Sequence, residues 1–217
     1  MPSTPEVSLS PARIGALAAG LLVLGLTSAP ADAEPAVPVN CSSGPVEITI
    51  DDLTYDLNGT CGVVRVLADD VTVRMSTATL LVVRGHRNTV VAKPVTRLVV
   101  LGRDHEVRTV SARHLKVASP GTAITVEGLV EAGRLGGRRA TVTADQVSTL
   151  HVPGAHNTLR TGSGYDASIG GNANTVRFRR LESLVVAGSD NRVRVRRGST
   201  AVRNDGRGNH ISVARRG

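Results

Sequence analysis

The sequence predicts an all-β protein, a single-domain parallel β-solenoid (β-helix) with coils of about 17 residues. Three observations lead to this prediction. Apolar residues make up 41% of the 217 residues, yet the aromatic side chains are limited to Tyr55, Tyr165 and Phe178. Glycine returns at intervals of about 17 residues, and apolar residues alternate with polar ones beside it. Alternation with a period of two indicates strands, and short strands must stack on their neighbours to bury an apolar face.

The repeated unit reads aliphatic-x-aliphatic-x-Gly-x-x-Asn-x-aliphatic and is seen in residues 81–90. Its glycine anchor returns along the chain, with Ala68 as a degenerate first copy: Gly85, Gly102, Gly121, Gly137, Gly154, Gly171, Gly188 and Gly206. Five residues after each glycine stands an aliphatic residue: Val90, Val107, Val126, Val142, Leu159, Val176, Val193 and Ile211. We expect this column, and the aliphatic columns two and four residues before the anchor, to line the interior.

The corners of the coils are expected to depend on glycine and asparagine. Glycine supplies a positive φ where the chain turns. Three residues after the anchor, asparagines occupy equivalent places, where their amides can hydrogen-bond from coil to coil: Asn88, Asn157, Asn174, Asn191 and Asn209. His105, Ile124 and Ala140 stand at this place in the middle copies, which is expected to weaken the ladder there.

Residues 1–33 have the pattern of a secretory signal peptide. Arg13 precedes an apolar run over residues 14–26, and Ala31-Asp32-Ala33 matches a small-x-small cleavage site. Cleavage near Ala33 would release a mature chain that is secreted or lies in the cell wall or periplasmic space. The run of about 13 residues is short for a membrane span, although its retention as an anchor stays open. No later segment is expected to cross a membrane.

Residues 34–67 are expected to form an N-terminal cap, and residues 68–217 the solenoid repeats. The cap contains both cysteines of the chain, Cys41 and Cys61. In an oxidising compartment we expect them to form a disulfide, which closes a loop of roughly 20 residues and stabilises the fold by about 3 kcal/mol. Two cysteines without further ligands predict neither a metal site nor a cofactor.

Charge is spread unevenly along a chain with a formal net charge of +8. Residues 34–70 contain seven acids and one arginine, whereas residues 171–217 contain eleven arginines and three acids. Arg160, Arg177 and Arg194 fall at equivalent places of consecutive coils, and three further arginines lie close to this file: Arg179, Arg192 and Arg196. This surface could bind a polyanion, such as an anionic envelope glycan or lipid head groups.

Two alternatives bear on this basic surface. A solvated edge that prevents aggregation would also explain the arginines. Nucleic acid is not expected as a partner, because the chain lacks the aromatic side chains that stack on bases. The oligomeric state is left open.

A partial threonine file is expected beside the charged file. The threonines are Thr89, Thr125, Thr141, Thr158 and Thr175, and the neighbouring outward file is Arg108, Glu127, Thr143, Arg160, Arg177 and Arg194. These charges do not fit a flat, ice-like plane, so the threonines are interpreted as β-branched residues on an exposed strand.

The sequence offers few candidates for catalysis. The acid pairs, Asp51–Asp52 and Asp69–Asp70, are adjacent in sequence, and adjacent strand residues point to opposite faces. The six histidines occupy different phases of the repeat and form no metal column. The chain is therefore interpreted as a non-catalytic structural or polyanion-binding module of the cell envelope. The alternative is a polysaccharide-active β-helix enzyme, a lyase or a hydrolase.

Residues 41–91 also resemble a known family. Cys41 precedes Gly59-Thr60-Cys61-Gly62-Val63-Val64-Arg65-Val66, which leads into the repeat at residues 80–90. This arrangement resembles a family of secreted actinobacterial proteins, a domain of unknown function of the 3060 type, with a Gly-Thr-Cys element between Gly-x-x-Asn-x-Val units. The resemblance implies export, a solenoid fold and a cysteine pair, and it implies no established activity. The chain departs from the pattern at Ala68-Asp69-Asp70-Val71.

Overall fold

The computed structural model describes residues 35–214. They belong to one compact unit, residues 34–217. The predicted signal peptide, its cleavage site near Ala33 and the alternative of a retained anchor lie outside the described residues.

The described residues form fifteen strands of one sheet and a single-turn 3-10 helix. The strands of the N-terminal coils are β1 (Val37–Asn40), β2 (Val46–Ile48), β3 (Thr54–Val66), β4 (Thr72–Val83), β5 (Thr89–Ala92), β6 (Val95–Val100), β7 (Glu106–Thr109) and β8 (Ala112–Val117). Those of the C-terminal coils are β9 (Ala123–Leu135), β10 (Thr141–Val152), β11 (Thr158–Ile169), β12 (Thr175–Val186), β13 (Arg192–Arg197), β14 (Ala201–Asn204) and β15 (His210–Val213). The helix, η1, spans Cys41–Ser43.

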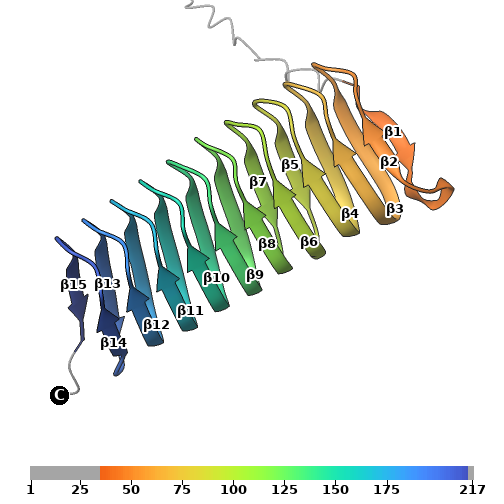
Figure 1. Ribbon diagram of the computed structural model, residues 1–217. Helices are drawn as coiled ribbons and strands as arrows, with labels where there is room; N and C mark the ends of the chain where they lie inside the picture. Colours follow the sequence, from red (N-terminus) through yellow and green to blue (C-terminus); the bar gives the residue numbers. More distant parts are fainter. Residues whose placement is uncertain (1–34, 215–217) are drawn as a thin grey trace, which may run out of the picture. The chain divides into compact units, whose positions relative to one another are not determined.

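These strands confirm the predicted parallel β-solenoid. Every pairing between them is parallel, and coils that follow one another in sequence lie side by side (Figure 1). Each coil contributes a first and a second strand stretch, which are either separate, as in β5 and β6, or joined in one bent strand, as in β12. Equivalent residues are 17 apart in most coils, as in the pairs Thr141–Thr158 and Thr158–Thr175.

Aliphatic side chains fill the interior. The residues of the first-strand column pair in register and are each at most 2% exposed: Val73, Val90, Val107, Ile124, Val142, Leu159, Val176 and Val193. Phe178 is the one aromatic residue of these C-terminal coils that is buried, with 1% exposure. Burial of each such side chain contributes about 1.5–3 kcal/mol, so the stack of coils is held chiefly by this column and its second-strand counterparts.

The anchor predicted at Gly121 is wrong by two residues. Val107 and Val142 both pair with Ile124, not with Val126. A Cβ atom at Gly137 would overlap the carbonyl oxygen of Ser119. At the other anchors, a Cβ atom would overlap the carbonyl oxygen of the anchor residue in the preceding coil in the same way. Ser119 is therefore the anchor of its coil, and the irregular intervals around Gly121 come from this misassignment.

The shift moves three other predicted positions. Thr122, not Ile124, takes the asparagine position, because its hydroxyl accepts the backbone N–H of His105. Thr125, not Glu127, pairs with Arg108 in the charged file. Ala123 consequently takes the place in the threonine file that was assigned to Thr125.

The role predicted for the anchor glycines also needs correction. Gly85 and Gly102 have positive φ, but Gly137, Gly154, Gly171, Gly188 and Gly206 do not. In these five a Cβ atom would overlap the carbonyl oxygen of the anchor in the preceding coil. The left-handed conformation falls instead on the residue before the asparagine position: Asp70, Arg87, Asp104, Gly121, Arg139, His156, Ala173, Asp190 and Gly208. At these five anchors glycine is thus needed for close approach of backbones and not for positive φ, whereas at Gly85 and Gly102 both reasons apply.

Buried asparagines bridge neighbouring coils at this corner. The side-chain oxygen of Asn174 accepts the backbone N–H of Asn157 at 2.9 Å, and its amide donates to the carbonyl of Gly154 at 2.9 Å. Asn191 repeats both bonds one coil further on, and Asn88 makes equivalent bonds near the N-terminal end. The ladder therefore satisfies buried backbone groups that the strand pairing leaves free.

His105 takes the asparagine position in the middle of the stack and is 2% exposed. Its Nε2 donates to the carbonyl of Leu101 at 2.6 Å, and its Nδ1 accepts the backbone N–H of Asn88 at 3.3 Å. This pattern requires a neutral imidazole. Burial lowers the pKa of His105 below its ordinary value of 6.5. Because Thr122 also accepts a ladder bond, the ladder lacks a side-chain acceptor within residues 71–209 only at Ala140.

The predicted disulfide between Cys41 and Cys61 is present, with the two Cα atoms 4.8 Å apart. Both cysteines are buried, with exposures of 4% and 1%. β1 and β2 already pair in parallel with β3. Residues 37–66 thus continue the solenoid to its N-terminal end, and the disulfide joins the first coil to the second.

Gly171→Ala is expected to lower the free energy of unfolding by about 1–3 kcal/mol or more, because the methyl group must displace the backbone of the preceding coil. Chemical denaturation measures the loss. Gly170→Ala is the matched control, since its Cβ would meet nothing within 4 Å. Equal stabilities for the two variants would contradict the close-approach role of the anchor.

Acidification is expected to destabilise the protein through His105. The unfolded chain binds a proton near pH 6.5, whereas the folded ring resists it. Stability therefore falls as the pH drops below 6.5, by up to about 1.4 kcal/mol per pH unit from this residue. Denaturation series at several pH values measure the slope. His105→Asn, which supplies the usual ladder residue, should flatten it; the same slope in both proteins would refute this assignment.

Candidate functional site

The arginines predicted from sequence lie on the outer face of the C-terminal coils. Arg160, Arg177 and Arg194 are direct pairing partners on β11, β12 and β13. Adjacent strands are about 4.8 Å apart, so these three side chains leave the sheet in a close row. Arg180 and Arg197 form a second pair of direct neighbours.

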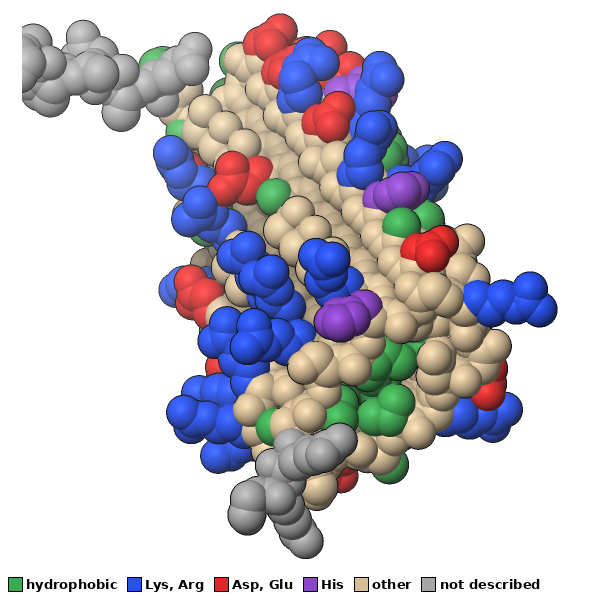
Figure 2. Space-filling view, turned by 90° about the vertical axis from the view of Figure 1, so that its left-hand side faces the viewer, with side chains coloured by type: hydrophobic (Ala, Val, Ile, Leu, Met, Phe, Trp, Pro, Cys, Tyr) green, Lys and Arg blue, Asp and Glu red, His purple; other side chains and the backbone are tan. Residues whose placement is uncertain are grey.

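Three further arginines complete this region. Arg179 and Arg196 lie on β12 and β13 between the two rows, and Arg192 begins β13, where it pairs with Thr175. We call the eight residues the arginine surface: Arg160, Arg177, Arg179, Arg180, Arg192, Arg194, Arg196 and Arg197. All eight are exposed. Figure 2, which faces the β13–β15 end, shows Lys and Arg side chains gathered along one side of the unit.

The arginine surface has no carboxylate partners among residues 35–214. Six arginines at other positions are paired with acids on the same or a neighbouring coil: Arg65 with Glu47, Arg74 with Asp56, Arg87 with Asp70, Arg108 with Glu106, Arg113 with Glu131 and Arg203 with Asp205. Others, such as Arg97 and Arg134, have no ion pair in the described chain. Arg108 belongs to the same outward file as Arg160, but its guanidinium forms an ion pair with the carboxylate of Glu106 at 2.8 Å. The C-terminal part of the file is therefore the part that keeps its positive charge.

Two shallow hollows lie on this surface. One, of about 490 Å³, is bordered by Arg160, Arg177, Arg179, Arg196 and Arg197. The other, of about 370 Å³, lies between Arg177, Arg192 and Arg194. No carboxylate lines either hollow. Guanidinium groups bind carboxylates and phosphates through paired hydrogen bonds, and rows of them suit a repeating anion better than a single one.

The acid pairs singled out in the sequence hold corners of the N-terminal coils. Asp51 accepts the backbone N–H of Asp69 at 2.7 Å. Asp69 in turn accepts the backbone N–H and the ring of His86, and the side-chain bond lowers the pKa of Asp69 below its ordinary value of 3.8. Asp70 forms an ion pair with Arg87 and raises the pKa of that guanidinium. These carboxylates are thus engaged in holding one coil to the next.

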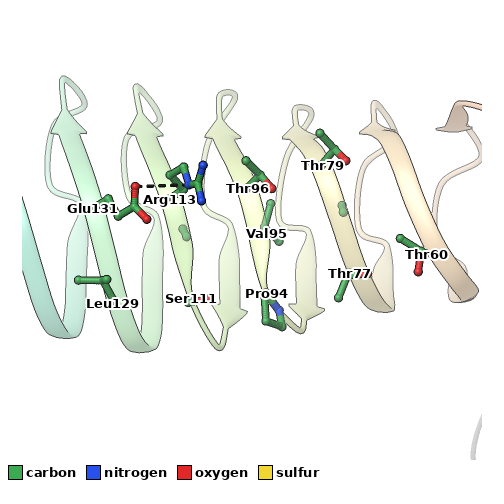
Figure 3. A pocket seen from close by; sticks show the side chains of 12 residues that line it. Thr60, Thr77, Thr79, Pro94, Val95, Thr96, Ser111, Arg113, Leu129 and Glu131 are labelled. Atoms are coloured by element: carbon green, nitrogen blue, oxygen red, sulfur yellow. Dashed lines mark ion pairs between the residues drawn. The ribbon is translucent and has the colours of Figure 1, made fainter.

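A third hollow, of about 410 Å³, lies over β3, β4, β6, β8 and β9 and differs in character. Threonine and serine hydroxyls dominate it, including Thr77 and Thr96 (Figure 3). The cation that lines it, Arg113, points toward Glu131 and pairs with it at 3.4 Å. This hollow therefore offers no free charge to a ligand.

Neither a metal centre nor a membrane helix is found in the part of the chain that the structure describes. Residues 35–214 contain no group of three His, Cys, Asp or Glu side chains placed to hold a metal ion. None of the helices found there is long and apolar enough to cross a bilayer.

Sequence reasoning missed one residue next to the arginine surface. Tyr165 on β11 is 60% exposed, and it lines a hollow of about 350 Å³ together with Arg180 and Arg197. The stretch around it, Gly162-Ser163-Gly164-Tyr165, belongs to the bend between the two strand stretches. No column of the repeat runs through Tyr165, so periodicity gave no signal for it.

A family model matches this part of the chain. Residues 160–208 match a protein of unknown function (DUF3060). The resemblance to this family is thus confirmed on the coils that carry the arginine surface, C-terminal to the segment 41–91 on which the sequence suggested it. No curated protein and no solved structure matches the chain.

Arg177→Thr is expected to stabilise the protein at low ionic strength, because it removes the middle charge of an unpaired row and places a β-branched residue on an exposed strand. Thermal unfolding should show a rise of about 1–4 °C that shrinks as salt is added. Arg65→Thr, which breaks the pair with Glu47, is the control and should give no rise. A lower Tm for Arg177→Thr at every salt concentration would contradict the unpaired charge.

Proposed function

We propose that the mature chain is an exported, non-catalytic β-solenoid that binds a polyanion of the cell envelope through the arginine surface. One observation carries the proposal: Arg160, Arg177 and Arg194 stand on consecutive strands, and no carboxylate in the described chain pairs with them. Like charges at strand spacing repel one another, and a bound chain of anions removes that repulsion.

The position of the row favours binding over protection of a sheet edge. β12 pairs with β11 on one side and β13 on the other, and β13 pairs onward with β15. Arg177 and Arg194 therefore lie within the sheet. Charges that protect an edge would be needed on the terminal strands, but β15 carries no arginine and Arg203 on β14 is paired with Asp205.

Two features support export to an oxidising compartment. Residues 1–33 have the pattern of a signal peptide, and Cys41 and Cys61 form a disulfide of the kind that persists outside the cytoplasm. In that compartment, the polyanions that the protein would meet are anionic glycans and lipid head groups. The two hollows bordered by Arg177 contain no acid, and the hollow lined by Arg180 and Arg197 contains a single one, Glu182. This favours binding over hydrolysis, since glycosidases use paired carboxylates.

The combined change of Arg160, Arg177 and Arg194 to Ser is expected to weaken binding to polygalacturonate about tenfold or more, because three charge-assisted contacts are lost. The wild-type chain should also bind polyphosphate, should release both polymers as the salt concentration is raised, and should not bind neutral dextran. Affinity is measured across a salt series on immobilised polymer.

The matched control changes Arg97, Lys116 and Arg134 to Ser. These residues are exposed, lie on β6, β8 and β9, and form no ion pair in the described chain, so the control removes the same charge from other coils. Equal losses in the two variants would mean that net charge, not the arginine surface, retains the polymer. Undiminished binding in the Arg160, Arg177 and Arg194 variant would reject the proposal.

A further inference from the structure

We infer that the polyanion is a carboxylated polysaccharide, one sugar unit of which stacks on Tyr165 while its carboxylate meets Arg180 or Arg197. This inference rests on the proposed function and extends it to a ligand class. Four observations around Tyr165 carry it: an exposed ring, a depression beside the ring, polar and cationic neighbours, and continuity with the arginine surface.

Tyr165 is the one aromatic residue of the described chain that faces solvent. It is 60% exposed, whereas Tyr55 and Phe178 are 6% and 1% exposed. A tyrosine presents a flat apolar face with a polar tip, and such rings are common where one surface of a ligand is apolar and its rim is polar. A pyranose ring has this character, with C–H groups on its faces and hydroxyls around its edge.

A depression lies next to the ring and borders Gly164. In the neighbouring coils the equivalent residues, Val147 and Leu181, fill this position and are buried. Gly164 itself is half-buried, and a Cβ atom there would stand only 3.0 Å from Leu181 and Phe178. Leu181 and Phe178 thus fill the space that a side chain at Gly164 would take, and Gly164 and Tyr165 together line the hollow of about 350 Å³.

The groups around this hollow suit a sugar acid. Gln146, Ser163, Arg180 and Arg197 are consecutive pairing partners on four strands, and all four line it. Glu182 lines it as well, and its carboxylate can accept hydrogen bonds from sugar hydroxyls. The amide and hydroxyl can hydrogen-bond to sugar hydroxyls, and the two guanidinium groups can bind a carboxylate. A phosphate polymer or an acidic peptide would use the arginines but has no pyranose face for the ring.

The hollow is continuous with the arginine surface. Arg197 lines both this hollow and the one bordered by Arg160 and Arg177. Arg179 lies between the two rows on β12. A polymer bound along Arg160, Arg177 and Arg194 can thus turn around the bend of the coil and reach Tyr165.

The test compares three polymers: polygalacturonate, which has carboxylates on sugar rings, polyglutamate, which has carboxylates without sugar rings, and polyphosphate. Tyr165→Ser is expected to weaken polygalacturonate binding about two- to tenfold and to leave the other two affinities unchanged. Tyr165→Phe keeps the ring and should retain most of the affinity. Thermal unfolding of both variants checks that they are folded.

The outcomes separate this inference from the proposed function. The inference is overturned if Tyr165→Ser binds polygalacturonate like the wild type, if it weakens all three polymers alike, or if the wild type prefers polyglutamate or polyphosphate. In these cases the arginine surface can still bind polyanions. If the Arg160, Arg177 and Arg194 variant loses no affinity for any polymer, the proposed function itself fails.

Discussion

Close contact between the backbones of successive corners is the constraint on which the rest of the structure depends. At Gly154, Gly171 and Gly188 each coil rests on the carbonyl of the one before, with no room for a side chain. The buried asparagines then bind the carbonyls and N–H groups that meet there, as Asn174 does. This contact fixes the register of every strand that follows. The arginine rows exist because that register places equivalent residues on adjacent strands.

Most of the fold could be predicted from the sequence because each column repeats many times. One error in the columns, at Gly121, had a physical cause: glycine serves two purposes in this corner. It is required at the anchor, where backbones touch, and it is favourable two residues later, where φ is positive. Ser119 occupies the first place and Gly121 the second, so a search for glycine selected the wrong one. The buried hydroxyl of Thr122 could not be distinguished from a surface threonine without the coil above it.

In the candidate site, too, the repeat predicts some features and leaves others unpredicted. The row of Arg160, Arg177 and Arg194 follows from period alone, since three equivalent residues on consecutive coils must be neighbours. Their lack of acid partners could not be predicted, because it depends on which residues of other strands lie within reach. Tyr165 lies at the bend between the two strand stretches, where the alternation of buried and exposed residues breaks down. Its exposure depends on the local path of the chain at this bend, which the repeat does not predict.

The missing acceptor at Ala140 has a consequence for how the stack comes apart. In a linear array each coil is held only by its two neighbours, so stability is a sum of nearest-neighbour terms and the weakest junction yields first. The backbone amide of Thr122 faces that junction, and protonation of His105 would loosen the junction with the coil of Asn88, two junctions away. The junction between the coils of Thr122 and Ala140 therefore depends on strand pairing and apolar packing alone at this corner, without the side-chain bond that the neighbouring junctions add.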